Sequence, residues 1–152
     1  MKKIAILLGS KSDLPYVEAA EEYFKFFELD YEVHISSAHR NPDKVATFCS
    51  TAREENYSLI IAAAGMAAHL AGAVAAHSTL PVLGVPLPGG ILDGVDALLS
   101  TVQMPAGVPV ATFAVGKAGM RNAAVFCAQI LALQNKHLQK KLIDFKKQGS
   151  RL

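Results

Sequence analysis

Short aliphatic runs alternate with longer amphipathic stretches along the whole chain. The short runs lack the polar alternation of a half-exposed strand, which is typical of parallel strands covered on both faces. Five of them predict strands, at Lys3–Leu8, Tyr31–Ser36, Ser58–Ala63, Pro81–Val85 and Val108–Phe113. The stretches between them predict helices over residues 14–28, 42–56, about 66–77, 93–102 and 118–147, the last divided in two near Asn135.

Strands and helices that alternate in this way favour right-handed βαβ units around an open parallel sheet. Five strands in a chain of 152 residues favour an α/β, flavodoxin-like three-layer sandwich with a parallel sheet in the order 2-1-3-4-5. We expect a single domain over residues 1–152, with a C-terminal helical tail at about 134–150. Ligands of such folds bind beyond the carboxyl ends of the strands, so chemistry is expected in the loops after strands one, two and three.

The first of these loops reads GSKSD over residues 9–13. Gly9 permits a tight turn, and the hydroxyls of Ser10 and Ser12, with the amides that open the next helix, can cradle a phosphate. Asp13 can cap that helix or accept hydrogen bonds from ribose hydroxyls. The loop is neither a Walker P-loop nor a GxGxxG turn, which argues against nucleoside triphosphates and dinucleotides.

The second loop reads SSAHRNPD over residues 36–43. Asparagine followed by proline is a strong helix start, with Asn41 at the N-cap and the proline at the first helical position. His39 and Arg40 are therefore expected just before the helix, on the ligand face. Arg40 offers a forked cation for a phosphate, Ser37 adds a hydroxyl, and the His39 imidazole can gain and lose a proton near neutral pH.

The third loop reads AAAGMAAHLAG over residues 62–72. Its small residues let a ligand ring or a neighbouring subunit approach closely, although packing of a helix against the sheet accounts for most of the alanines. His69 is a polar group in an otherwise apolar segment and therefore needs a partner. The remaining histidines, His34, His77 and His137, are predicted to be structural or solvated.

Composition adds a prediction of self-association. Hydrophobic residues make up 51% of the chain and charged residues 18%, against typical values of about 45–50% and 25%. So little charge in a soluble chain indicates that an oligomer covers part of its surface, and the apolar stretch Ala123–Leu133 points the same way. The basic residues clustered in 136–152 are better explained by a solvated helix end than by nucleic-acid binding, because no aromatic side chains interleave with them.

Several other classes of protein find no support in the sequence. Cys49 and Cys127 fit neither a metal site nor a disulfide framework and are predicted to be buried thiols of a cytoplasmic protein. The run Leu59–Ala76 is long enough to raise the question of a membrane span, but its alanines, glycines and central histidine argue against one. No HExxH, paired-cysteine or carboxylate cluster indicates a metal, and no GxSxG motif indicates covalent hydrolysis.

At these loops the sequence resembles the N5-carboxyaminoimidazole ribonucleotide mutases, the class I PurE family. The matching segments are GSKSD, SAHR-x-PD, AAHL-x-G at 67–72, PVLGVP at 81–86, GVDALLS at 94–100, VQMP-x-GVPV at 102–110 and VGKAG at 115–119. The resemblance implies a cofactor-free isomerase of purine (IMP) biosynthesis. Such an enzyme converts N5-carboxyaminoimidazole ribonucleotide to 4-carboxy-5-aminoimidazole ribonucleotide by decarboxylation and recarboxylation.

The resemblance also implies roles for particular residues: phosphate and ribose contacts at Ser10, Asp13 and Arg40, and proton transfer at His39. Together with the loops it predicts a site with neither metal nor cofactor. The expected catalytic residues are His39 and His69, and the expected substrate-binding residues are Gly9, Ser10, Ser12, Asp13, Ser37, Ala38, Arg40, Gly65, Ala68 and Leu70. The implied partners are a small ribonucleotide substrate and seven further copies of the chain in a homo-octamer, without nucleic acid or membrane.

Two alternatives stay open. One is a direct aminoimidazole ribonucleotide carboxylase that uses free carbon dioxide, and the other is a nucleotide-sensing module without catalysis. The chain also departs from the common pattern of the family, with Asn41 in place of threonine, Met66 in place of glycine and Ala71 in place of proline. The stretch Leu87–Asp93 differs most, which leaves open how it closes over a substrate.

Overall fold

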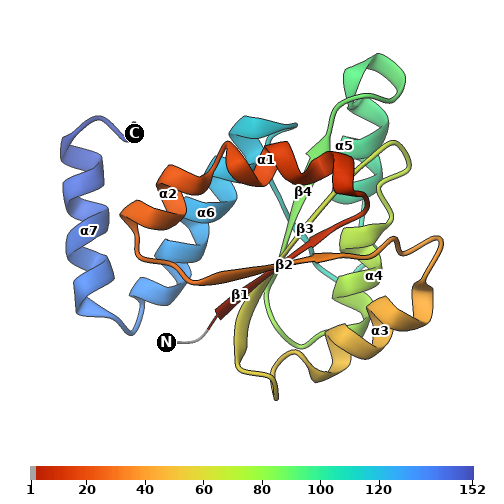
Figure 1. Cartoon of the computed structure of the whole chain (residues 1–152), viewed down its shortest axis with the longest axis horizontal. Helices are drawn as coiled ribbons and strands as arrows, with labels where there is room; N and C mark the ends of the chain where they lie inside the picture. The colour runs from red at the N-terminus through yellow and green to blue at the C-terminus, as the bar shows by residue number, and fades with distance from the viewer. Residues whose placement is uncertain (1–2) are drawn as a thin grey trace.

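A five-stranded parallel sheet runs through the middle of the computed structural model, which describes residues 3–152 (Figure 1). Its order is β2-β1-β3-β4-β5, as predicted, and this confirms the flavodoxin-like fold class. The predicted fifth strand is too long, because Pro109 lacks the N–H that a strand ladder needs. The strands are β1 Lys3–Leu8, β2 Tyr31–Ile35, β3 Tyr57–Gly65, β4 Val82–Leu87 and β5 Ala111–Thr112.

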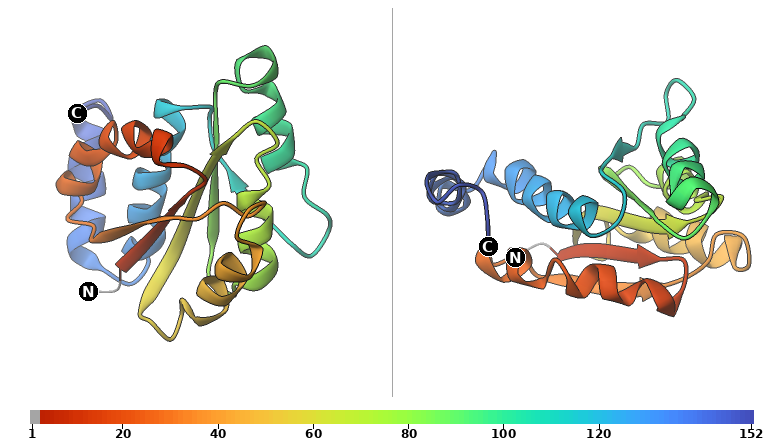
Figure 2. Two further views of the ribbon diagram at one scale, coloured as in Figure 1. Left: turned by 45° about the vertical axis from the view of Figure 1, so that its right-hand side comes forward. Right: turned by 90° about the horizontal axis from the view of Figure 1, so that it is seen from above.

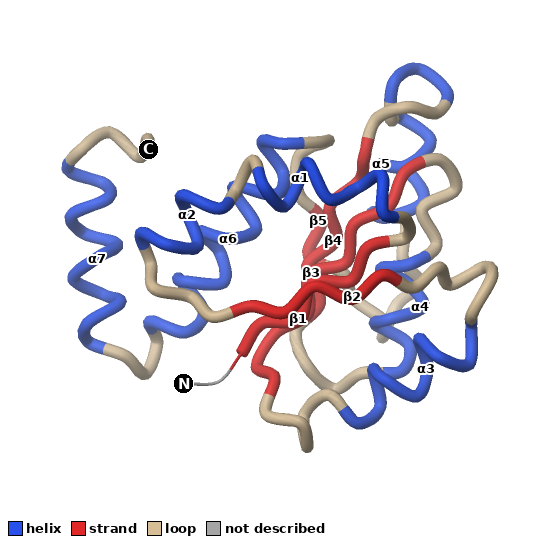
Figure 3. Tube along the Cα trace, in the orientation of Figure 1, coloured by secondary structure: helices blue, strands red, loops and turns tan. Residues whose placement is uncertain are grey.

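The helices follow the predicted pattern with one further break (Figure 3). The predicted helix over 14–28 is interrupted at Ala20, whose N–H donates to the Val17 carbonyl three residues back instead of four (2.9 Å). The predicted break near Asn135 is confirmed, because the Asn135 side chain caps a new helix by accepting from His137 N–H (3.0 Å). The helices are α1 Leu14–Glu18, α2 Glu21–Phe26, α3 Pro42–Thr51, α4 Leu70–His77, α5 Val95–Val102, α6 Lys117–Ala132 and α7 Lys136–Lys147, with 3₁₀ turns η1 Lys11–Asp13 and η2 Ile91–Asp93. In residues 3–152 no helix combines the length and the hydropathy needed to cross a membrane.

Alternate residues of each strand feed two separate hydrophobic cores, one on each face of the sheet. Ile4, Ile6 and Leu8 of β1 pack towards α1, α2 and α6, in what we call the α6 layer. Ala5 and Leu7 pack towards α3 and α4, in the α4 layer (Figures 1 and 2). Each layer holds one buried free cysteine, Cys127 in the α6 layer and Cys49 in the α4 layer, which confirms the predicted burial.

Helix α7 lies at the edge of the α6 layer, on the opposite side of the molecule from α5 (Figure 2). The ring of Phe145 lies 5.2 Å from that of Phe27 and 5.7 Å from that of Phe26, measured between centroids. The Glu28 carboxylate reaches α7 at two points, 2.8 Å from Lys141 Nζ and 3.1 Å from His137 Nε2. The predicted tail is therefore a packed helix and part of the fold.

Gly84 in β4 lets α5 approach the sheet closely. A Cβ at this position would lie 2.5 Å from Thr101 Cγ2 and 2.7 Å from Val110 Cγ1. Because the segment between β4 and α5 is short, this close packing also holds residues 88–94 beside the carboxyl ends of β3 and β4.

Candidate active site

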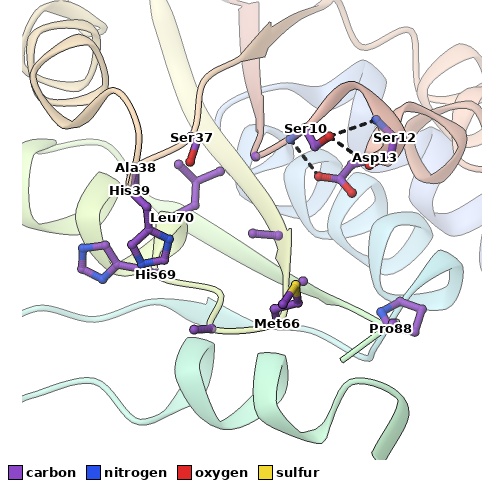
Figure 4. Close-up of a pocket in the computed structure, with 15 residues that line it drawn as sticks. Ser10, Ser12, Asp13, Ser37, Ala38, His39, Met66, His69, Leu70 and Pro88 are labelled. Atoms are coloured by element: carbon purple, nitrogen blue, oxygen red, sulfur yellow. Dashed lines mark hydrogen bonds between the residues drawn. The ribbon is translucent and has the colours of Figure 1, made fainter. Parts of the chain in front are cut away.

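A cavity of about 390 Å³ opens at the carboxyl ends of β1, β2, β3 and β4 (Figure 4). Strand β1 lies between β2 and β3, so the loops that follow these three strands meet at one edge of the sheet, as predicted. The segment after β4 closes the remaining side. The lining residues are Gly9, Ser10, Ser12, Asp13, Ser37, Ala38, His39, Ala64, Gly65, Met66, Ala67, His69, Leu70, Pro88 and Gly89.

The loop after β1 forms a capping box around the 3₁₀ turn η1. Ser10 is the N-cap, and its Oγ accepts hydrogen bonds from the Ser12 N–H (3.3 Å) and the Ser12 hydroxyl (2.9 Å). The Asp13 carboxylate bonds back to the Ser10 N–H (3.0 Å). Ser10 therefore caps the turn where Asp13 was the expected cap, and its own hydroxyl hydrogen is free to donate to a ligand oxygen.

The Asp13 carboxylate lies in a partly desolvated position at the cavity wall (Figure 4). Burial raises the pKa of this carboxyl above its ordinary value, and the hydrogen bond from the Ser10 N–H opposes that rise. A carboxylate is an acceptor of several hydrogen bonds, and only one oxygen of Asp13 is engaged by Ser10. The other oxygen can accept a hydrogen bond from a ligand hydroxyl.

Two histidines from different loops lie side by side at the cavity mouth. The ring of His39 from the loop after β2 stacks on that of His69 from the loop after β3, with centroids 5.3 Å apart and planes inclined by 22° (Figure 4). Both side chains are exposed. His69 thus finds an aromatic partner, but it lies at the surface, not in the apolar interior that the surrounding sequence suggested.

The loop after β3 has a strained backbone at its first residue. Met66 has φ of 56°, in the left-handed region that disfavours every side chain with a Cβ. Its own side chain is 67% exposed and lines the cavity. Gly65, the last residue of β3, precedes it, and a Cβ there would lie 3.5 Å from the Pro88 carbonyl oxygen, so the end of β3 lies against the segment after β4.

The segment after β4 is held by Asp96 at the start of α5. The Asp96 carboxylate accepts a hydrogen bond from the Ile91 N–H (3.1 Å) and packs closely against Gly90. Leu92 and Asp93 follow with φ of 48° and 53°, two consecutive left-handed residues. This divergent segment is therefore an ordered turn, and Pro88 and Gly89 at its start contribute to the cavity wall.

The structure brings together all but two of the residues predicted for the site. Arg40 is exposed and does not line the cavity, although its main-chain N–H donates to the Ser37 hydroxyl (3.3 Å). Ala68 is buried and does not line the cavity either. Asn41 occupies the predicted N-cap position without a side-chain cap hydrogen bond.

Five of the lining residues were not predicted from the sequence. Ala64, Met66 and Ala67 belong to the third loop, but their apolar side chains carry no chemical signal. Pro88 and Gly89 follow β4, whose loop was not expected to hold the chemistry. The predicted strand order, which places β4 beside β3, was the signal that could have found them. Across residues 3–152, no three His, Cys, Asp or Glu side chains are grouped closely enough to hold a metal ion.

Comparisons with known sequences and solved structures all point to one protein family. A sequence model described as AIR carboxylase matches residues 3–151. An N5-carboxyaminoimidazole ribonucleotide mutase of Escherichia coli K12 is 50% identical over 145 residues, which is 95% of this chain and 86% of the relative. A protein of the same name from Saccharolobus solfataricus is 47% identical over 95% of this chain and 90% of its own length. Among solved structures, Treponema denticola PurE superposes with a TM-score of 0.86 at 26% identity, covering 97% of this chain and 90% of that one.

Proposed function

The chain belongs to the AIR carboxylase family, and we propose that it catalyses the reaction for which its relatives are named. This is the conversion of N5-carboxyaminoimidazole ribonucleotide to 4-carboxy-5-aminoimidazole ribonucleotide in purine biosynthesis. The observation that carries the proposal is the near-complete match to mutases at 44–50% identity. The cavity with its paired histidines is consistent with such a reaction, because a carboxylate that moves between two atoms of one substrate needs a proton carrier beside it.

The cavity has the size and polarity for one ribonucleotide. Its volume of about 390 Å³ lies within the range of small-molecule sites, roughly 300–1,000 Å³. We assign the phosphate to the Ser10 hydroxyl and to the Ser12 hydroxyl, which would exchange its hydrogen bond to Ser10 Oγ for one to the phosphate. Arg40 would reach the phosphate from the rim as a charged partner. The free oxygen of Asp13 then accepts from a ribose hydroxyl, which leaves the imidazole ring between the two histidines and the Gly65–Leu70 loop.

His39 carries one proton through the reaction in this proposal. The carbamate N–C bond breaks, carbon dioxide leaves, and the exocyclic nitrogen takes a proton from His39. The ring carbon then attacks carbon dioxide, and neutral His39 removes the proton that this carbon loses. The histidine ends as it began, and no redox step or ATP hydrolysis is required. Positioned proton transfer of this kind contributes typically about 10²–10⁴-fold to a rate.

His69 supports His39 in this scheme. The two rings stack with centroids 5.3 Å apart, so His69 is placed to hold the His39 ring beside the substrate. The stacking also fixes the plane of the His39 ring. Met66, Ala67 and Pro88 form an apolar wall of the cavity, which would exclude water and retain carbon dioxide between the two half-reactions.

An isotope experiment separates this reaction from direct carboxylation. Purified protein is supplied with N5-carboxyaminoimidazole ribonucleotide in the absence of added bicarbonate, ATP and metal. Product should form, and labelled bicarbonate should enter it slowly compared with transfer of the substrate's own carboxylate. Turnover of aminoimidazole ribonucleotide with abundant labelled carbon dioxide, and none of the carbamate, would assign the direct carboxylase. Binding of the carbamate without any turnover would assign a sensing module.

We further propose that the active form is a homo-octamer of single-domain chains. An exposed apolar stripe supports self-association: Val95, Leu99 and Val102 lie at helical spacing along α5, next to Ile91 and Leu92. The apolar stretch Ala123–Leu133 supports it less than its sequence suggested, because most of its small residues pack in the α6 layer. The buried free thiols and the metabolic role support a cytoplasmic location, and the proposed reaction calls for neither a nucleic-acid nor a membrane partner.

A further inference from the structure

Met66 places a long apolar side chain at the surface of the active-site cavity. Its side chain is 67% exposed, whereas Leu70, which also lines the cavity, is buried in the core of the α4 layer. In the view of Figure 4, Met66 lies between the histidine pair and Pro88. A single exposed methionine is common at a protein surface, so its place in the cavity and its backbone are what distinguish it.

The loop around Met66 maintains its strained backbone. A φ of 56° is in the left-handed region, which a residue with a Cβ occupies only at a cost. The Met66 carbonyl accepts a hydrogen bond from the Ala68 N–H (2.9 Å), and the side chains of Ala68 and Leu70 are buried. Strained residues that the surrounding structure maintains gather at ligand sites. The strain is therefore a second observation, independent of the exposure, that gives the Met66 side chain a role at the cavity.

The segment after β4 offers little side chain to cover a ligand beyond Pro88. Gly89 lines the cavity, and a Cβ at this position would meet no atom within 4 Å. Gly90 cannot carry a side chain, because its Cβ would collide with the Asp96 carboxylate. Both this segment and Met66 depart from the common pattern of the family, and the fold brings them to one cavity. The Met66 side chain therefore has open space beside it in which to turn over a ligand.

The placement of the nucleotide proposed above puts its imidazole ring at the Gly65–Leu70 loop, where Met66 is exposed. A methionine side chain is unbranched and flexible, so it adapts to the face of a ring. The carbon dioxide released beside that ring carries no charge that a polar side chain could hold. Its retention depends on an apolar surface that closes over the reacting atoms and excludes water.

We propose that the Met66 side chain folds over the imidazole ring of the bound ribonucleotide and is the cover that keeps carbon dioxide in the cavity between the two half-reactions. This inference rests on the function proposed above, because it concerns the same nucleotide at the same site. Met66 is exposed in the free chain and becomes buried when the nucleotide binds. The strained backbone holds the side chain at the cavity before the ligand arrives.

The first measurement is the rate at which hydrogen peroxide oxidises Met66, read by mass spectrometry. Peroxide transfers one oxygen atom to the thioether, which becomes a sulfoxide while the peroxide becomes water. Saturating product, 4-carboxy-5-aminoimidazole ribonucleotide, should slow this oxidation severalfold. Ribose 5-phosphate, which has no ring for Met66 to cover, should leave the rate unchanged. Met104, whose sulfur packs against Gly72, is the internal reference and should react equally in all samples.

The second measurement compares Met66→Gly, which removes the cover, with Met66→Leu, which keeps an apolar side chain of similar size. Met66→Gly should bind the product about tenfold more weakly. During turnover of the carbamate it should release more free aminoimidazole ribonucleotide, and more of its product should carry label from added bicarbonate. Met66→Leu should resemble the wild type in each respect. So should Ile143→Ala, which shortens an exposed apolar residue on α7 and is the matched control.

Equal oxidation of Met66 with and without the product would overturn the proposal. Slow oxidation already in the free protein would also overturn it, because Met66 would then lie beneath another copy of the chain. So would a Met66→Gly variant with the affinity and the label uptake of the wild type. A wild type that does not turn over the carbamate would refute the proposed function instead, whereas protection from peroxide tests the Met66 contact without any turnover.

Discussion

The stacked histidines at the cavity mouth give the clearest prediction for a single residue. His39→Asn keeps a polar group beside His69 but removes the ability to carry a proton near neutral pH. We expect kcat to fall by roughly 10²-fold or more while the dissociation constant of the ribonucleotide stays nearly unchanged. Stopped assays with the carbamate substrate, alongside calorimetric binding, measure both quantities. Turnover within threefold of the wild type would remove His39 from the mechanism.

Arg40 is predicted to act on binding and not on the chemical step. Its exposed side chain lies outside the cavity wall, so Arg40→Ala should leave the fold and the histidine pair intact. Loss of a hydrogen bond from a charged group should cost about 1.5–3 kcal/mol of substrate affinity. The measurement compares the change in KM with the change in kcat for Arg40→Ala. Arg53→Ala, which removes an arginine outside the cavity lining, is the control. A lower kcat at unchanged substrate affinity would contradict the assignment.

Met66 stores backbone strain at the site. A residue with a Cβ in the left-handed region destabilises the fold by about 1–2 kcal/mol. Glycine avoids this strain, but its greater freedom in the unfolded chain costs roughly 0.5–1 kcal/mol. Because the Met66 side chain is 67% exposed, Met66→Gly loses little burial and should stabilise the chain by roughly 0.5–1 kcal/mol. Denaturant unfolding measures this, with Ala67→Gly as the unstrained control. A destabilised Met66→Gly chain would show that contacts of the Met66 side chain stabilise the fold by more than its backbone strain costs.

At the scale of elements, hydrophobic patterning predicted those helix and strand boundaries that are set by residues next to them in the sequence. The break at Asn135 was predictable because the side chain caps the next helix itself. The break at Ala20 was not, since alanine favours helix and the interruption follows from packing of α1 and α2 along α6. The third loop was found through His69. The position of Met66 at the cavity wall was not predicted, because it depends on a left-handed backbone conformation that a methionine in the sequence does not indicate.

Helix α7 provides a prediction about pH. Hydrogen bonds from Lys141 and then His137 lower the pKa of the Glu28 carboxyl below its ordinary value of 4.5. A lowered pKa means that this contribution to stability is complete above pH 4.5 and is lost as the pH falls through the pKa of the folded chain. Glu28→Gln should therefore melt below the wild type at about pH 6, and the difference should shrink at about pH 3.5.

Glu18→Gln is the matched control for this comparison. Glu18 is exposed at the end of α1 and makes no ion pair in the region that the structure describes. The melting temperature of the Glu18→Gln variant should equal that of the wild type at both pH values. A gap between Glu28→Gln and the wild type that persists unchanged at the lower pH would show that Glu28 acts through packing and not through its charge.

At the scale of the whole molecule, topology predicted more of the site than chemistry did. The order 2-1-3-4-5 brings residues 9–13, 37–39 and 64–70 to one edge, although the chain separates them by tens of positions. Polar residues in those loops, combined with the predicted strand order, were enough to predict from the sequence where this cavity lies. The contribution of Pro88 and Gly89 depended on the close packing of α5 at Gly84, which has no polar signature.

The apolar stripe on α5 predicts the behaviour of the whole assembly. Sedimentation should show a particle several times larger than the 16.2 kDa chain at micromolar concentration. Leu99→Glu places a charge in the middle of the stripe and should shift the particle towards smaller species, whereas Glu18→Lys should not. A wild-type chain that sediments as a monomer would contradict self-association, and an unaffected Leu99→Glu assembly would place the contact elsewhere.

The division of the core into two layers also equips the molecule with a pair of internal reporters. Each layer holds one thiol, and burial suppresses the reactivity of both, raising the pKa of Cys49 to about 11 and that of Cys127 still further. A thiol reagent can therefore modify either cysteine only when its own side of the sheet opens. The two labelling rates, read separately by mass spectrometry, report whether the faces of the sheet open together as one cooperative unit or independently.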